Sequence, residues 1–355
     1  MAENSSPTAG TITTRVLFCG LSFPTSFEYT KQYLLPYPFI QVDAIPHDKV
    51  PDIIGGYEIC VVRGMKLDAN VISLARQMKL IVQFGVGLEG VDIEAATKFG
   101  IKVARIPGNT SGNSLSCAEH AIYLILGLLR DQKGMEKAFK ERMLGVPAGE
   151  TLYGKTVHIV GYGNIGKDLA VRLRPFGVKI LATRRCWHSK STVDLNKQDA
   201  VYTYPTQSTG DGNIKDDLID EKGGNECLYD FASRADIVVT CATMTSETVG
   251  MVNAKFLSLM KKGAFLVNVA RGGLLDYEAV KASLESGHLG GLGADVAWFE
   301  PFDPADPILQ HPKVFITPHV AGVTEFSYRN MAKIIGDCAL HLHNGDSLVG
   351  VEIVN

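Results

Sequence analysis

Short runs of apolar residues alternate along the chain with segments in which apolar residues recur every three or four positions. Near the N-terminus, the runs at 15–19, 58–62 and 80–84 are typical of buried strands. Between the last two runs, residues 68–78 have helical spacing, with apolar positions at Val71, Ile72, Leu74, Ala75 and Met78. Strands that alternate with helices favour a parallel α/β architecture.

The same alternation resumes after a turn-rich stretch at 106–113. An apolar segment at 114–130 predicts a long helix that would face either its own core or a second subunit, with Ser116 and Glu119 as an N-terminal capping box. The later segments predicted as strands are 156–160, 178–182, 237–240, 265–269 and 314–317, and those predicted as helices are 167–176 and 326–342.

Residues 189–226 interrupt this alternation. They are polar and rich in glycine, and they contain no apolar run of the kind that marks the other strands. We therefore expect a surface loop at this place, partly without fixed structure.

Composition narrows the classes of function. The 355 residues exceed what one compact core usually holds, so we expect two domains. The net charge of -3 offers no excess of positive charge for a phosphate backbone, which argues against nucleic acid as the main partner. No apolar stretch approaches the roughly 20 residues that span a membrane. Seven scattered cysteines lack metal-site or redox spacing, so we expect free thiols, no metal and a cytoplasmic protein.

A glycine-rich turn, Gly161-Tyr-Gly163-Asn164-Ile165-Gly166, lies between a predicted strand and a predicted helix. In that context the pattern binds the pyrophosphate of a dinucleotide. The first glycine permits the tight turn, the second lets the backbone approach the pyrophosphate, and the third lets helix and strand pack closely. The N–H groups at the start of the helix then face the phosphates. We predict a dinucleotide site, the alternative being a turn without a ligand.

The end of the next predicted strand bears on the choice of dinucleotide. An acidic residue there would bind the adenosine ribose hydroxyls, but this chain has Thr183-Arg184-Arg185. Two guanidinium groups suit the 2′-phosphate of NADP(H), because arginine pairs with phosphate in a forked geometry. NADP is therefore mildly favoured over NAD. In the alternative interpretation, both arginines only solvate the start of the following loop.

Three residues after predicted strands have the chemistry that reduction of a carbonyl requires. Arg271 follows the strand at 265–269 and could hold a carboxylate and polarise a keto oxygen, although a surface ion pair is the alternative. His319 follows the strand at 314–317, and histidine is the usual proton donor near neutral pH. Glu300 could favour the imidazolium form of that histidine and fix its orientation.

With these residues in place, the chain resembles the D-isomer-specific 2-hydroxyacid dehydrogenase family from about Val16 to its C-terminus. The resemblance rests on the glycine turn at 161–166, on Val269-Ala270-Arg271-Gly-Gly273, on the segment from Asp295 to Pro301, and on Thr317-Pro-His319-Val-Ala321-Gly322. It is closest in kind to glyoxylate/hydroxypyruvate reductase-like or phosphoglycerate dehydrogenase-like members. The chain departs from the family at Arg184, at Thr243, where many members have proline, and at the polar segment 189–226.

The resemblance implies a fold of two Rossmann-like, doubly wound α/β domains, with the cofactor domain inserted into a flavodoxin-like substrate domain. Residues 1–112 and 323–355 would form the substrate domain, and residues 113–322 the dinucleotide-binding domain with its polar insert at about 189–226. The family usually forms dimers across the cofactor domains, so a homodimer is expected.

The resemblance also implies a set of site residues. Arg271, Glu300 and His319 would be catalytic, and Val86 and Gly87 would bind the substrate carboxylate through backbone N–H groups together with Arg271. The cofactor contacts would come from Gly161, Gly163, Asn164, Ile165, Gly166, Thr183, Arg184, Arg185, Thr243, Val269, Ala270, Asp295, Ala321 and Gly322.

The expected function is hydride transfer between NAD(P)H and a small 2-oxo or 2-hydroxy acid of D configuration, with glyoxylate or hydroxypyruvate as the preferred substrates. The alternative is a dinucleotide-sensing scaffold, because the C-terminal binding protein corepressors look similar. In that case the segment 189–226 would carry the partner site.

Overall fold

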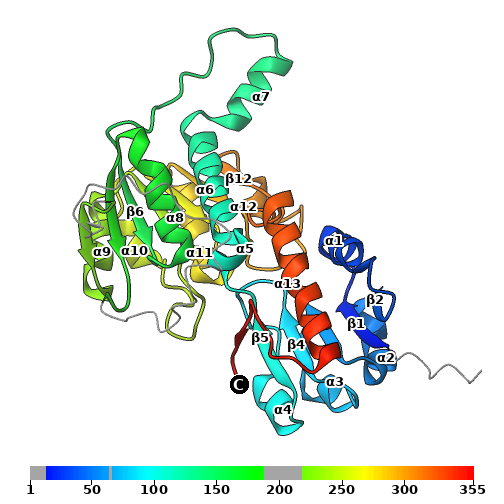
Figure 1. Ribbon diagram of the computed structural model, residues 1–355. Coiled ribbons are helices and arrows are strands. Elements are labelled where there is room, and N and C mark those ends of the chain that lie inside the picture. Colours follow the sequence, from blue (N-terminus) through cyan, green and yellow to red (C-terminus); the bar gives the residue numbers. More distant parts are fainter. Residues whose placement is uncertain (1–12, 64–65, 188–217) are drawn as a thin grey trace, which may run out of the picture. The chain divides into compact units, whose positions relative to one another are not determined.

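The computed structural model describes residues 13–63, 66–187 and 218–355 (Figure 1). The chain divides into two compact units. Unit 1 consists of Met1–Gly112 and Glu325–Asn355, and unit 2 consists of Asn113–Thr324. Most of the polar segment expected to form a loop or a partner site, residues 188–217, lies outside the described residues.

Unit 1 is built on a six-stranded sheet of order β13-β5-β4-β3-β1-β2. Five strands are parallel, and the short β13 pairs antiparallel with β5 at the edge. The parallel strands follow the order 2-1-3-4-5, which is the flavodoxin-like order. The strands are β1 Thr14–Cys19, β2 Ile40–Ile45, β3 Ile59–Val62, β4 Leu80–Gln83, β5 Lys102–Arg105 and β13 Glu352–Ile353.

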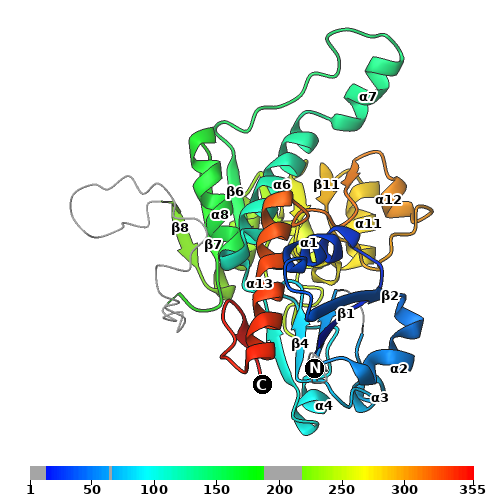
Figure 2. The ribbon, with the colours of Figure 1, turned by 45° about the vertical axis from the view of Figure 1, so that its right-hand side comes forward.

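Helices cover both faces of this sheet. The long α1 (Pro24–Leu34) and α13 (Glu325–Asn344) lie side by side (Figure 2), and the Tyr33 hydroxyl donates to Asp337 at 2.6 Å. The short helices are α2 Val50–Ile53, α3 Ala69–Ser73, α4 Ile93–Lys98 and α5 Gly108–Ser111. The helix predicted at 68–78 is thus shorter than expected: Asp68 caps its start, and single turns replace it after Ser73.

Unit 2 is built on a seven-stranded parallel sheet of order β12-β11-β10-β9-β6-β7-β8. Counted from β6, the first six strands follow the 3-2-1-4-5-6 order of dinucleotide-binding sheets, and β12 extends it. The strands are β6 Thr156–Val160, β7 Lys179–Thr183, β8 Glu221–Gly223, β9 Ile237–Thr240, β10 Phe265–Asn268, β11 Gly291–Ala294 and β12 Val314–Ile316.

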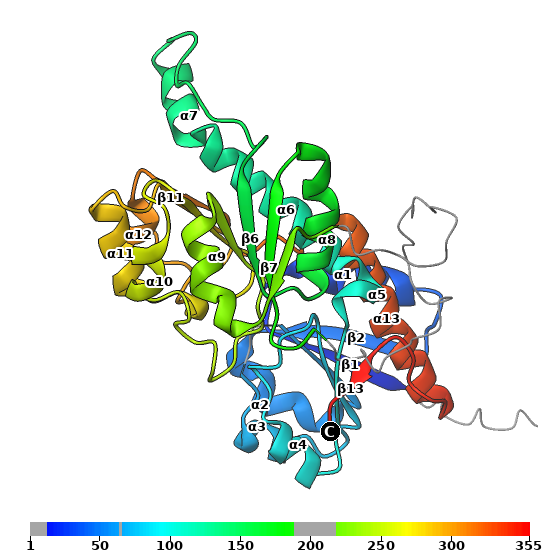
Figure 3. The same cartoon turned by 90° about the vertical axis from the view of Figure 1, so that its left-hand side faces the viewer.

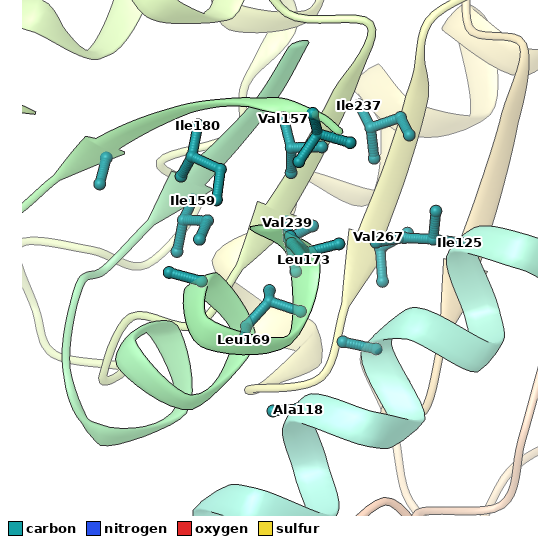
Figure 4. Packing of buried hydrophobic residues seen from close by; sticks show 14 of the residues in the cluster. Ala118, Ile125, Val157, Ile159, Leu169, Leu173, Ile180, Ile237, Val239 and Val267 are labelled. Atoms are coloured by element: carbon teal, nitrogen blue, oxygen red, sulfur yellow. The ribbon is translucent and has the colours of Figure 1, made fainter. Parts of the chain in front are cut away.

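Successive side chains of these strands enter two different cores. Val157 and Ile159 face α6 (Asn113–Leu129) and α8 (Asn164–Leu173), whereas Val160 joins the core of the opposite face. Figure 4 shows Leu169 and Leu173 of α8 and Ile125 of α6 packed on the first face. Figure 3 shows helices on both sides of the sheet. The opposite face is covered by α9 Leu228–Arg234, α10 Ala254–Leu259 and α11 Tyr277–Glu285, and α12 Pro307–Gln310 precedes β12.

The expected fold class is confirmed: both units are doubly wound α/β sheets, and the chain of unit 2 is inserted into that of unit 1. Two details were wrong. The helix α6 begins at Asn113, so Ser116 lies inside it and bonds Thr324 at 2.8 Å, while Glu119 pairs with Arg172. The polar segment also does not run as a loop to Glu226, because β8 pairs with β7 there.

No helix among the described residues is long and apolar enough to cross a membrane.

Candidate active site

The glycine turn joins β6 to α8, and each glycine in it has a separate steric reason. Gly161 has φ +96°, and a Cβ there would collide with the backbone of Ala242. A Cβ on Gly166 would lie 2.8 Å from the Gly161 carbonyl oxygen, so the third glycine allows helix and turn to pack closely. At Gly163 a Cβ would meet nothing within 4 Å, which leaves space beside the N-terminus of α8. That open space and the unpaired N–H groups of the first helical turn fit a dinucleotide pyrophosphate.

Thr183, at the end of β7, supports the turn through its backbone. Its carbonyl oxygen accepts from Gly161 N at 3.1 Å and from Tyr162 N at 2.9 Å, while its buried side chain bonds His158. Arg184 and Arg185 follow directly. The Arg184 N–H donates to the Gly223 carbonyl oxygen of β8, and Arg185 lies 3.9 Å from Glu247 in an exposed ion pair. Both arginines therefore lie at the carboxyl end of β7, where the sequence placed the adenosine end of a cofactor.

Arg271 lies in a tight turn just after β10, and Asn268 holds that turn. The Asn268 carboxamide is fully buried, donates to the Arg271 carbonyl oxygen at 2.9 Å and accepts from Ala270 N at 3.0 Å. The next residue, Gly272, is so close to the Ala297 carbonyl that a Cβ would overlap it. The turn that carries Arg271 is thereby packed against the segment that carries Glu300.

His319 and Glu300 form a direct pair. The Nδ1 atom of His319 lies 2.7 Å from Oε2 of Glu300, and the other carboxylate oxygen accepts from Ala297 N at 3.2 Å. Burial alone would raise the pKa of Glu300, but the hydrogen bond and charge of His319, the Ala297 N–H and the charge of Arg271 hold this pKa below the usual carboxyl value. The three residues predicted to do the chemistry therefore lie together beyond the carboxyl ends of β10, β11 and β12.

Asp295 organises the loop that carries His319. Its side chain is 1 % exposed and accepts from Thr317 Oγ1 at 2.6 Å, from Val320 N at 2.8 Å and from Ala321 N at 2.7 Å. Its carbonyl oxygen accepts from His319 N at 2.8 Å. These bonds hold His319 at φ +54°, a left-handed conformation that costs a residue other than glycine on the order of 1–3 kcal/mol.

The remaining predicted residues divide between the two units. In unit 2, Val269 and Ala270 are buried in the turn after β10, Gly322 packs against Asn113, and Thr243 lies exposed in the loop after β9. In unit 1, Val86 and Gly87 follow Gly85, whose φ of +131° turns the chain sharply after β4. No group of three or more His, Cys, Asp or Glu within the described ranges could hold a metal ion.

Sequence reasoning missed four supporting residues: His120, Asn268, Ala297 and Thr317. Asn268 directly precedes the Val269-Ala270-Arg271 motif and Thr317 begins the segment 317–322, so their closeness to Arg271 and His319 in the sequence was an available signal. His120 had none, because it contacts Thr317 only through the tertiary fold.

Several known proteins are similar to this chain. The sequence profile of the D-isomer specific 2-hydroxyacid dehydrogenase, NAD binding domain, matches residues 122–208 and 212–321. A D-3-phosphoglycerate dehydrogenase of Bacillus subtilis is 30% identical over 88% of this chain and 55% of its own length. A glyoxylate reductase of Korarchaeum cryptofilum is 29% identical over 81% of each chain.

Solved structures agree with the sequence matches. The NADPH-dependent glyoxylate/hydroxypyruvate reductase of Sinorhizobium meliloti superposes with a TM-score of 0.73 at 25% identity, over 96% of this chain and 97% of that one. The chain spans about half the length of the phosphoglycerate dehydrogenases that it matches. The profile match covers more than half of the chain, and it includes the glycine turn as well as Arg271, Glu300 and His319. The chain therefore belongs to the D-isomer-specific 2-hydroxyacid dehydrogenase family.

Proposed function

We propose that this chain is an NAD(P)-dependent D-2-hydroxyacid dehydrogenase that reduces a small 2-oxo acid and oxidises the corresponding 2-hydroxy acid. The observation that carries the proposal is the 2.7 Å pair of His319 and Glu300 beside Arg271, in the same unit as a dinucleotide-type glycine turn. An acid, a carboxylate to tune it and a cation for the substrate are what reduction of a 2-oxo acid requires.

The cofactor would be held by the glycine turn and by the residues that follow β7. The Gly161–Gly166 turn and the first N–H groups of α8 would bind the pyrophosphate, and Arg184 and Arg185 the adenosine end. A nicotinamide dinucleotide bound there supplies the hydride chemistry at the carbonyl carbon. The fit of the dinucleotide rests on the open space at Gly163 and on the turn geometry that Thr183 supports.

The roles of the three central residues follow from their contacts. Arg271, with its turn fixed by Asn268, orients the substrate carboxylate and polarises the keto oxygen. His319 as imidazolium gives a proton to the developing alkoxide during reduction and takes it back during oxidation. Glu300 stabilises that imidazolium and fixes the ring through Nδ1, which leaves Nε2 as the nitrogen for proton transfer.

Glyoxylate or hydroxypyruvate is the proposed substrate, and NADPH the mildly favoured reductant. Relatives named glyoxylate reductase cover four fifths of the chain, and a similar structure is named as NADPH-dependent. The arginines at 184–185 support the same preference, because the chain has two guanidinium groups directly after β7 instead of a carboxylate. The assignment of Val86 and Gly87 to the substrate carboxylate, the homodimer and the cytoplasmic location stay predictions.

The proposal is tested by steady-state oxidation of NADPH and of NADH with a panel of small 2-oxo acids. We expect turnover with glyoxylate or hydroxypyruvate, and we expect His319→Ala to lower kcat by about 10²–10⁴-fold because the general acid is lost. Binding of NADPH, followed by its fluorescence, should change little in this variant. Absence of turnover with every acid and both cofactors would refute the proposed function.

A further inference from the structure

His120 lies on α6, far from His319 in the sequence, but its ring contacts the loop that carries His319. The Nε2 atom is 2.7 Å from Thr317 Oγ1 and 3.4 Å from Asp295 Oδ1. The Thr317 hydroxyl in turn donates to Asp295 Oδ1 at 2.6 Å, so the polar atoms of the three side chains are in mutual contact. All three residues belong to unit 2.

The number of hydrogens on each group determines which atom donates and which accepts in this series of hydrogen bonds. A threonine hydroxyl has one hydrogen, and here Asp295 accepts it, so the Thr317 oxygen can only accept from His120. Nε2 of His120 must therefore carry a hydrogen. Burial lowers the pKa of His120, against the opposing charge of Asp295, so the neutral ring protonated on Nε2 meets this requirement.

This series of hydrogen bonds ends at the Asp295 carboxylate, which holds the loop that carries His319. Asp295 also accepts from Val320 N and Ala321 N, on the C-terminal side of His319, and its backbone accepts from His319 N itself. The His319 backbone has a left-handed φ of +54°, which these bonds must maintain. An Asp295 carboxylate that turned away would release both sides of His319.

We infer that His120 is a positioning residue for the proposed dehydrogenase: its Nε2–H fixes the Thr317 hydroxyl, which fixes Asp295, which holds His319 in place for proton transfer. This inference rests on the proposed function. His120 contacts Thr317 and Asp295 rather than Glu300 or Arg271, so its effect must pass through the loop. A fault in the loop should lower kcat more than it raises KM for the 2-oxo acid, because the proton donor is misplaced while Arg271, the residue proposed to bind the substrate carboxylate, is untouched.

The experiment compares His120→Leu, His120→Gln and Thr317→Val, with Glu119→Ala as the matched control on the same helix. The glutamine amide can place an N–H near the position of Nε2, whereas leucine cannot. Glu119 has a mostly exposed side chain that pairs with Arg172 and is outside the chain of bonds. Two readouts are used: steady-state kcat and KM, and hydrogen exchange of the peptide that contains 317–322.

We expect His120→Leu and Thr317→Val each to lower kcat about tenfold with little change in KM, as one lost buried hydrogen bond would. The double variant should be no worse than either single variant, because the two changes break the same chain. Amides 319–321 should exchange faster in both, His120→Gln should recover most of the loss, and Glu119→Ala should match the wild type in both readouts.

The inference is overturned if His120→Leu keeps wild-type kcat and wild-type exchange at 319–321, or if Gln rescues nothing while all variants keep the wild-type melting temperature. If His120→Leu does not fold, Thr317→Val with the exchange readout decides alone. Exchange does not depend on turnover, so a wild type without activity on any 2-oxo acid would refute the proposed function and still leave the positioning claim measurable.

Discussion

The orientation of the His319 side chain depends on its own backbone conformation as much as on Glu300. Its left-handed φ places Nδ1 against the Glu300 carboxylate at 2.7 Å, and the Asp295 bonds keep it there. Residue types and motif order led from the sequence to His319, Glu300 and Arg271 as candidates, and the structure places the three side by side. The residues that orient them were not identified, because a buried amide such as Asn268 or a hydroxyl such as Thr317 has no periodic or compositional mark.

Arg184 offers a test at the scale of one side chain. We expect Arg184→Asp to shift the ratio of kcat/KM for NADPH to that for NADH toward NADH by about 10–100-fold, because one charge-assisted contact to the 2′-phosphate is lost and a repulsion is added. Steady-state kinetics with both cofactors measures it. Arg76→Asp, on the exposed surface of unit 1, makes the same charge change as a control. An unchanged ratio in Arg184→Asp would remove the basis for an NADP preference.

At the scale of elements, two of the five strands that the sequence missed have a physical reason for their weak signal. The strand β11 has the sequence Gly-Leu-Gly-Ala, and glycine weakens a strand signal. The glycines are needed because α6 lies directly over them: a Cβ on Gly293 would be 3.2 Å from both Leu124 and Leu128. The edge strand β8, Glu-Lys-Gly, is polar and short, and only its pairing with β7 reveals it. Tertiary packing decides both cases.

The α6 helix shows the same dependence on context. Its apolar character left two interpretations open, a subunit contact or an internal core. The structure places Ala118, Ala121, Leu124, Ile125 and Leu129 inside the core of unit 2. The apolar residues of α6 therefore indicated correctly that the helix is buried. They did not indicate which part of the molecule covers it.

Gly272 provides a prediction about two loops. Because a Cβ at this position would overlap the Ala297 carbonyl, Gly272→Ala must push the Arg271 turn away from the Glu300 segment. We expect kcat/KM to fall by about 100-fold or more, since misplacement by about 1 Å can cost that much. Gly287→Ala is the control away from the site: its Cβ would meet nothing within 4 Å, and its φ of +70° gives the variant backbone strain without displacing the Arg271 turn. Wild-type kcat/KM in Gly272→Ala would contradict the packed arrangement.

At the scale of the whole molecule, the structure offers a surface through which the expected homodimer would form. The helix α7 (Gln132–Lys140) and the segment that follows it project from the rest of unit 2 in every view (Figures 1–3). This arm exposes Phe139 by 85% and Leu144 by 96%. A groove of about 250 Å³ at its base is lined by Leu128, Phe265 and Phe315, together with charged residues that include Lys133 and Glu150. In a twofold-symmetric dimer, the arm of each copy would bind in the groove of the other copy.

We expect the double variant Phe139→Ser, Leu144→Ser to weaken the dimer by about 100-fold or more in Kd, because two buried apolar anchors would be lost. Sedimentation equilibrium measures the change. The paired variant Lys140→Ser, Glu141→Ser alters neighbouring polar residues of the same arm and should leave the dimer intact. A monomeric wild type, or an unchanged Kd in the double variant, would contradict an interface at this arm.

The central claim is that the charged Glu300 carboxylate holds the His319 ring through Nδ1 for proton transfer. Because the pKa of Glu300 lies below the usual carboxyl value, this charge is present at that value and above it, and it is lost as the pH falls through the lowered pKa. kcat/KM for reduction should therefore fall in acid as Glu300 takes up a proton. A glutamine at position 300 carries no charge and takes up no proton in this range, so this acid limb should be absent from Glu300→Gln.

The decisive measurement is the pH profile of kcat/KM for reduction in the wild type, in Glu300→Gln and in the control Glu285→Gln, which changes an exposed carboxylate at the end of α11. We predict that Glu300→Gln lowers kcat/KM by about tenfold or more at neutral pH, because one charge-assisted hydrogen bond is lost, and that it lacks the acid limb, whereas the control keeps the wild-type profile. A Glu300→Gln profile with the height and the acid limb of the wild type would contradict this account.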